Sequence, residues 1–147
     1  MVSAQQLLDD YLYIGPLLVQ RLQEQLAGDM PVEMVEDLQT AGESERRAHV
    51  VWVLWAGDQF GDQAMGGAGQ AFAQRWLVVL FIRNESLGNR ASRSQAAGAW
   101  LGRIQRALGG FKPAGCVRGL RRAQGPSPNY TKAEGMFPLL FAIDLNL

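Results

Sequence analysis

A long hydrophobic run lies at the centre of the chain. Seven consecutive apolar residues extend from Trp76 to Ile82, between Arg75 and Arg83. Their number, and their content of β-branched and aromatic residues, are typical of a strand rather than a helix. Alternate side chains of a strand point to opposite sides, so both faces of this strand are apolar. We therefore expect a central strand that must be covered on both sides.

Four further segments are expected to form strands. Residues 48–56 and 136–145 are apolar on both faces, like the central strand. Residues 31–37 alternate between apolar and charged side chains, which indicates a half-exposed strand at a sheet edge. Residues 114–123 form a weaker, basic strand. Pro138 cannot donate a ladder hydrogen bond, so it should lie at the entry of the last strand or on an edge.

Two regions have helical spacing. Within residues 3–28 the pattern is interrupted by Gly15-Pro16, which is compatible with a short helix followed by a longer one, or with one kinked helix. A later helix is predicted over residues 91–108, where apolar residues form a single stripe. Gly98 and Gly102 lie four positions apart on it. This spacing predicts close packing of that helix against the sheet.

The remaining segments read as loops. Residues 38–47 form a polar loop, and residues 124–134 are rich in proline and polar residues. Residues 57–70 contain five glycines and two aspartates. This composition predicts a long mobile hairpin tip.

The order of elements defines the expected fold. Residues 1–147 should form one α+β domain, with a mixed or antiparallel sheet of four or five strands and two helices packed mainly on one face. Two helices cannot cover both faces of three two-faced strands. The uncovered surface predicts a curled sheet or association with copies of the same chain.

Charge is distributed unevenly along a chain whose net charge is zero. Residues 1–62 contain eleven acidic residues and three basic ones, and residues 63–147 contain eleven basic and three acidic ones. The folded surface can mix these charges. Alternatively, an acidic face can meet a basic face of a neighbour, head to tail, as in ring-forming subunits. A nucleic-acid surface is a weaker alternative, because no Lys/Arg run is interleaved with exposed aromatic residues.

No pattern for catalysis, a cofactor or a metal is found. The single histidine, His49, begins a core strand and is interpreted as structural, and the glycine-rich segment lacks the GK[ST] ending of a phosphate loop. The single cysteine, Cys116, excludes an internal disulfide and is interpreted as inert. The apolar runs are too short for a membrane span, and the N-terminus has no secretory pattern. We therefore expect a protein that is not an enzyme, has no cofactor and contacts no membrane.

The succession of these features resembles a known family. The segments VEMVED, VVWVLW and QRWLVVLFIRN, the helix RSQAAGAWLGRIQRALGGFKP and the closing segment YTKAEGMFPLLFAIDL are similar to small tail-completion proteins of Mu-like, contractile-tailed phages. Residues 74–84 carry most of the resemblance, and Tyr130 and Gly135 match a Tyr and a Gly that often precede the last strand in that family.

The resemblance implies a phage tail terminator. Such a protein is a structural α+β subunit that forms a hexameric ring on the end of the tail tube. It ends tube polymerisation and provides the head-tail joining surface. Its partners would be copies of itself, the tail tube protein, and the sheath or the head-tail connector protein. DNA would pass through the ring without specific binding. The implied location is the virion tail, after assembly in the host cytoplasm.

This interpretation leads to two sets of expected contact residues. Acidic and basic residues are expected to pair across the subunit interface: Glu33, Glu36, Asp37, Arg90, Arg93, Arg103 and Arg106. Residues of two loops are expected to contact the tube or the connector: Phe60, Met65, Gly66, Gly67, Tyr130 and Lys132. The alternative function is a small nucleic-acid-binding protein that uses the basic C-terminal half.

Overall fold

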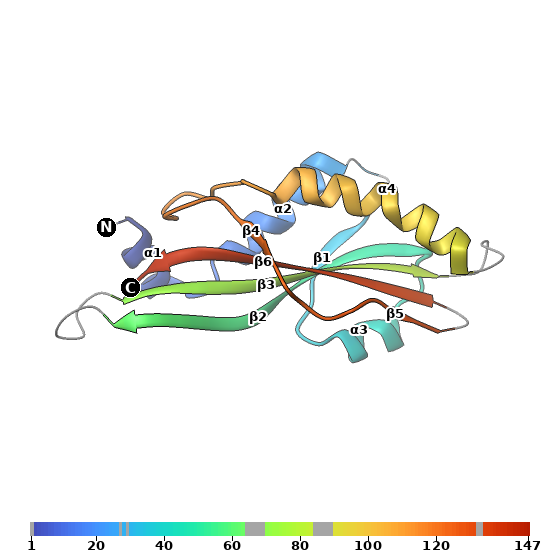
Figure 1. Ribbon diagram of the computed structural model, residues 1–147, viewed down its shortest axis with the longest axis horizontal. Coiled ribbons are helices and arrows are strands. Elements are labelled where there is room, and N and C mark those ends of the chain that lie inside the picture. The colour runs from blue at the N-terminus through green and yellow to red at the C-terminus, as the bar shows by residue number, and fades with distance from the viewer. Residues whose placement is uncertain (1, 27, 29, 64–69, 84–89, 132–133) are drawn as a thin grey trace.

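The computed structural model describes residues 2–26, 28, 30–63, 70–83, 90–131 and 134–147 (Figure 1). Its elements are α1 (Val2–Asp9), α2 (Ile14–Leu26), β1 (Val32–Met34), α3 (Leu38–Ser44), β2 (His49–Gln63), β3 (Gln70–Arg83), α4 (Arg90–Leu108), β4 (Arg121–Ala123), β5 (Asn129–Tyr130) and β6 (Glu134–Asn146). Helices pack on a single sheet, so the expected α+β class is confirmed.

The sheet is mixed and is built around the predicted central strand. Its strands follow the order β1-β2-β3-β6-β4, and β5 also pairs with β6. Only β1 and β2 are parallel; the other pairs are antiparallel. Trp76 of β3 lies opposite Trp55 of β2 and Phe141 of β6. The three long strands form an elongated, twisted sheet, with short strands at its two edges (Figure 1).

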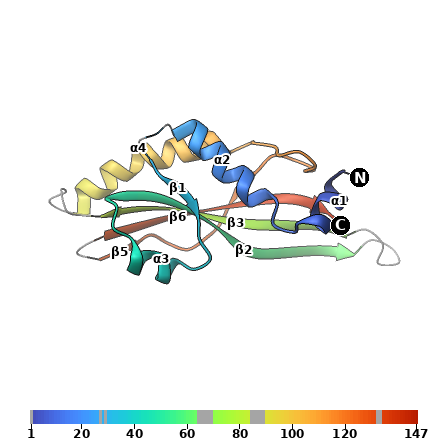
Figure 2. The same ribbon diagram turned by 180° about the vertical axis from the view of Figure 1, so that it is seen from behind.

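Two antiparallel helices, α2 and α4, cover the first face of the sheet (Figure 2). In α2 the fully buried leucines Leu18, Leu22 and Leu26 recur every four residues and pack on the sheet. The two helices also cap each other: Arg21 Nε donates to Ala107 O, and Arg103 Nη2 donates to Leu26 O, both at 3.0 Å. These carbonyls belong to the last turns, where no partner exists within the helix. The short α1 is separate from α2, so the N-terminal region forms a short helix followed by a longer one and not one kinked helix.

The second face is covered in part by a helix that was expected to be a polar loop. Residues 38–44 form α3, and Asp37 caps it: its carboxylate accepts from Thr40 N at 3.0 Å and from Thr40 Oγ1 at 2.6 Å. Asp is a strong helix N-cap, a signal that the composition of this segment concealed. Leu38 and Ala41 pack against a second cluster that includes Trp52 and Phe81. The chain therefore hides more of its own apolar strand surface than two helices could.

The glycine-rich segment is also more ordered than expected. β2 continues to Gln63 and β3 begins at Gln70, so only residues 64–69 of the expected mobile tip lie outside the described residues. A bulge between Trp55 and Asp58 contains Gly57 with φ +92°, a conformation that suits glycine. Pairing with β3, including Phe60 opposite Phe72, overrides the local composition.

Other boundaries differ in detail. The expected strand over residues 114–123 is reduced to β4, and the expected loop over 124–134 contains β5. Pro138 lies opposite Val79, in a stretch of β6 that neither β4 nor β5 pairs, which matches the expected edge position. The prediction that the helix packs closely against the sheet at Gly98 and Gly102 was wrong. Both are exposed, and a Cβ atom at either would have no neighbour within 4 Å.

Candidate assembly surfaces

An aromatic cluster lies near the end of the sheet at which β2 and β3 are joined. Phe60 stacks on Phe72 with ring centroids 5.0 Å apart, and Phe72 stacks on Tyr11 at 6.0 Å. Trp55 meets Tyr11 edge-on at 6.2 Å. Trp55 is 43% exposed and Phe60 is 48% exposed. Trp55 and Phe60 are thus held at the surface by ring contacts, Phe60 with Phe72 of β3 and Trp55 with Tyr11, which lies between α1 and α2.

The carboxylate of Asp58 fixes this cluster to the helices. Asp58 Oδ2 accepts from Tyr11 Oη at 2.5 Å, and Asp58 Oδ1 accepts from Trp55 Nε1 at 3.2 Å. Burial, and then the hydrogen bond to Asp58, raise the pKa of Tyr11 above its usual value. The phenol therefore stays protonated at neutral pH and remains a hydrogen-bond donor. The bulge after Trp55 brings Asp58 onto the helix side of the strand.

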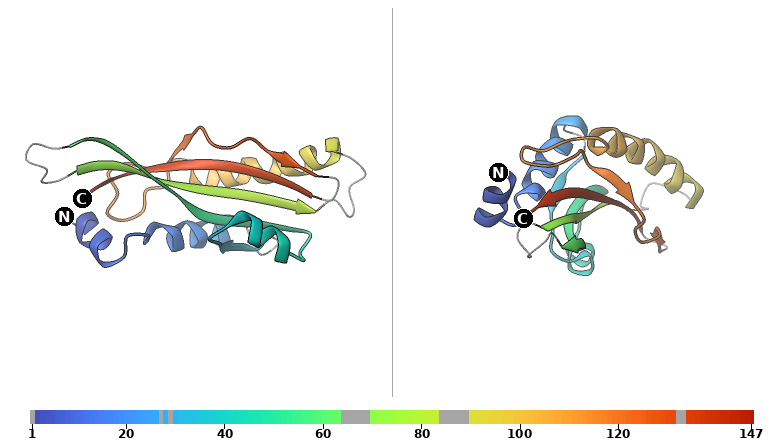
Figure 3. Two further views of the ribbon diagram at one scale, coloured as in Figure 1. Left: turned by 90° about the horizontal axis from the view of Figure 1, so that it is seen from below. Right: turned by 60° about the vertical axis from the view of Figure 1, so that its left-hand side comes forward.

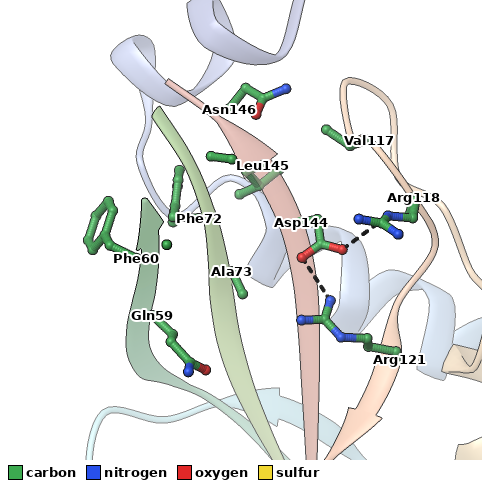
Figure 4. Close-up of a pocket in the computed structure, with 12 residues that line it drawn as sticks. Gln59, Phe60, Phe72, Ala73, Val117, Arg118, Arg121, Asp144, Leu145 and Asn146 are labelled. Atoms are coloured by element: carbon green, nitrogen blue, oxygen red, sulfur yellow. Dashed lines mark hydrogen bonds and ion pairs between the residues drawn. The ribbon is translucent and has the colours of Figure 1, made fainter. Parts of the chain in front are cut away.

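A shallow hollow of about 350 Å³ lies beside β6 at the same end of the sheet (Figure 4). Its lining includes Gln59 and Ala73 of the sheet and Val117 of the loop that precedes β4. Asp144 of β6 receives two arginines there: Arg121 Nη1 at 2.8 Å and Arg118 Nε at 3.4 Å. Two cations share one carboxylate, so this side of the hollow has an excess of positive charge.

The opposite edge of the sheet is acidic. Arg47 Nη2 lies 2.7 Å from both Glu33 and Glu45, and the buried Glu45 also accepts from the backbone N–H groups of Arg46 and Arg47. The hydrogen bonds from Arg47 lower the pKa of Glu45 to about 2. These two carboxylates are neutralised within the subunit.

Three neighbouring acidic residues on and before α3 have no cationic partner among the described residues. We call these three the acidic ridge: Glu36, Asp37 and Glu43. All three are exposed. The hydrogen bonds from Thr40 lower the pKa of Asp37, so this side chain is ionised at neutral pH.

Glu45 gives the fold a dependence on pH. Because its pKa falls from 4.5 to about 2 on folding, its stabilisation is present above pH 4.5 and is lost as pH falls towards 2. We expect Glu45→Gln to lower the unfolding free energy at pH 7 by about 2 kcal/mol, because Arg47 loses its buried partner. Urea unfolding at several pH values would measure this loss, which should shrink as pH approaches 2.

The control for this prediction is Glu24→Gln. Glu24 is exposed and is bonded only to Gln20 among the described contacts. Its replacement should change the unfolding free energy by less than about 0.5 kcal/mol at any pH. Equal losses for the two variants would show that Glu45 has no special role.

The expected interface arginines all lie on α4, in different situations. Arg90 and Arg93 are in its first turns, and their side chains are not described. Arg103 is engaged within the subunit, since it donates to Leu26 and lies 4.6 Å above the ring of Trp100. Arg106 is exposed. Sequence reasoning did not select the arginines around β4, although the pairing of β4 with β6 brings them to Asp144.

Two of the expected tube and connector contacts, Phe60 and Tyr130, lie at opposite ends of the sheet. Phe60 pairs with Phe72 of β3, whereas Tyr130 pairs with Gly135 of β6, which in turn pairs with Ile82 of β3. Ten residues of strand separate these positions, which corresponds to roughly 33 Å. The side chain of Tyr130 is not described, and Met65, Gly66, Gly67 and Lys132 lie outside the described side chains.

The single cysteine lies in the core and the single histidine is half-buried. Cys116 is buried, its Sγ lies 3.8 Å from Tyr13 Oη, and burial raises the pKa of its thiol. His49 stacks on Trp100 with centroids 6.1 Å apart. Within the described residues, no group of three potential ligands could hold a metal ion. No helix in that part of the chain is long and apolar enough to cross a membrane.

The comparisons with known proteins agree with a structural role. No curated protein matches the chain. Comparison with protein families matches residues 8–147, nearly the whole chain, to the family described as Phage tail terminator protein. This family is structural and completes virion tails, where its members associate with tail and head-tail joining proteins. The chain belongs to the phage tail terminator family.

Proposed function

We propose that this chain forms a closed ring on the end of the tail tube, ends tube polymerisation and provides the surface that joins the head-tail connector. The family match over residues 8–147 carries this proposal. The two edges of the sheet differ, with β1 and α3 at one and β4 at the other. Contacts between unlike edges are heterologous, and such contacts close into a ring when the rotation between subunits is suitable.

The exposed aromatic pair supports a docking role for the β2–β3 end of the subunit. Large aromatic side chains dominate the binding energy of many protein interfaces. We assign Trp55 and Phe60 to the tail tube protein, and the opposite end, near Tyr130, to the connector or the sheath. The subunits would meet the tube in the host cytoplasm during assembly, and DNA would pass through the finished ring without specific binding.

Tube capping can be tested with purified components. The tail tube protein is allowed to polymerise with and without this chain, and tube lengths are measured by electron microscopy. We expect rings at one end of each tube and an end to its growth. Unchanged growth and bare ends would contradict the proposal. DNA binding that weakens steeply with salt would favour the nucleic-acid-binding alternative.

The double variant Trp55→Ser/Phe60→Ser tests which end docks. We expect its affinity for tube ends to fall at least about tenfold, because two anchoring side chains are lost. Ring formation, followed by native mass spectrometry, serves as the internal control and should be retained. Normal capping by this variant would exclude the aromatic pair as the tube contact.

A further inference from the structure

The acidic and basic parts of the chain lie on opposite long sides of one sheet. β1 forms one edge, with α3 beside it on the second face of the sheet, and β4 and the loop before it follow the other edge (Figure 3, left). Three strands, β2, β3 and β6, separate β1 from β4. The charge asymmetry along the sequence is therefore also an asymmetry in space.

The basic side carries a charge excess that its own subunit does not neutralise. We call the three exposed arginines on it the arginine edge: Arg118, Arg121 and Arg122. Arg118 and Arg121 share Asp144, whereas Arg122 Nη1 donates to the neutral amide of Gln105 at 3.2 Å.

The acidic side carries an excess of the opposite sign. Arg47 is occupied by Glu33 and Glu45, and Arg46 donates to the backbone carbonyls of Glu43 and Glu45. Five acidic residues between 33 and 45 thus stand against these two arginines. Glu36 and Glu43 are exposed near the start and the end of α3. Glu43 belongs to α3 and Glu36 directly precedes its cap Asp37, so the helix and its cap fix the backbone at both positions before a partner binds.

From this arrangement we infer that neighbouring subunits join through the acidic ridge of one copy and the arginine edge of the next. The inference rests on the proposed ring, and it names the partner as a second copy of the chain. Each subunit carries both complementary surfaces on opposite sides, which is what a head-to-tail contact requires. A nucleic acid would use only the arginine edge and would leave the acidic ridge unpaired.

Charge reversal tests this pairing through complementation. The ridge variant is Glu36→Lys/Glu43→Lys, which leaves the α3 cap Asp37 intact. The edge variant is Arg121→Glu/Arg122→Glu. Each variant alone presents two surfaces of like charge and should lose rings at concentrations where the wild type forms them. An equimolar mixture should form rings again, in which the two variants alternate and the number of subunits is even.

Two further samples keep the outcome interpretable. The neutral variant Arg121→Gln/Arg122→Gln places no acid beside Asp144 and should weaken ring formation about tenfold or more. Glu24→Lys reverses the charge of an exposed residue on α2, outside both charged surfaces, and should leave ring formation unchanged. Thermal unfolding confirms that each variant is folded. Ring formation is measured by native mass spectrometry at several concentrations and salt levels.

The outcomes separate this inference from the proposed function. If both reversal variants form rings as the wild type does, the inference is overturned, and the proposed capping of the tube is unaffected. Loss of rings in both variants without recovery in the mixture would also overturn it, as would an equal loss in Glu24→Lys. A wild-type chain that neither forms rings nor caps tubes would overturn the proposed function itself.

Discussion

Replacing Gln74 by leucine should lower the free energy of unfolding by about 3 kcal/mol, because it leaves a buried indole N–H and a partly buried carbonyl without the partner that Gln74 supplies. Gln74 is fully buried in β3. Its Oε1 accepts from Trp76 Nε1 at 2.9 Å, and its Nε2 donates to Tyr11 O at 3.0 Å. One amide thus connects the core tryptophan to the turn between α1 and α2. Leucine retains the volume but makes neither hydrogen bond.

Denaturant unfolding at one fixed protein concentration measures this effect. The matched control is Gln59→Leu, at an exposed position of the neighbouring strand β2, which should change the unfolding free energy by less than about 0.5 kcal/mol. Adding Trp76→Phe to Gln74→Leu removes one of the orphaned groups. The double variant should therefore lose less than the sum of the two single losses. Additive losses would show that the Trp76–Gln74 hydrogen bond contributes little.

A second large effect is expected at Gly15, where α2 touches the sheet. A Cβ atom at this position would lie 2.8 Å from Met34 Sδ and 2.8 Å from the ring of Trp76. Met34 is exposed and can move, but Trp76 is fully buried. We expect Gly15→Ala to lower the unfolding free energy by about 2 kcal/mol, because close-packed cores resist added atoms.

Gly98→Ala is the matched control for this substitution and should have the opposite sign. Gly98 also lies in a helix, but a Cβ atom there would have no neighbour within 4 Å. Alanine should raise the unfolding free energy by about 0.5–1 kcal/mol, because it restricts the unfolded chain and favours helix. If both substitutions had the same sign, helix propensity rather than packing would govern these positions.

Strong hydrophobic periodicity allowed the main elements to be predicted. The central strand, its two long neighbours and the helices α2 and α4 all lie where apolar residues recur with the period of a strand or a helix. Such patterns persist because one side of each element must leave water. The α+β class and the edge position of β1 follow from the same information.

Weakly apolar segments could not be predicted in this way. The helix α3 contains few apolar residues, and its start depends on one carboxylate, Asp37. The distal half of β2 has a loop-like composition but is held by its hydrogen-bonded partner β3. The exposed aromatic pair and the arginine edge also depend on partners distant in sequence, such as Tyr11 for Trp55 and Asp144 for Arg121.

By itself, the sequence determined the long strands and the long helices, the α+β class, and the separation of acidic and basic residues into different halves of the chain. Only the tertiary structure decided that these charges lie on opposite edges of one sheet, and that Phe60 and Tyr130 lie at opposite ends of it. Periodicity reports which side of an element is buried. It contains no information on which elements become neighbours, because strand order and register depend on pairings between residues far apart in the chain.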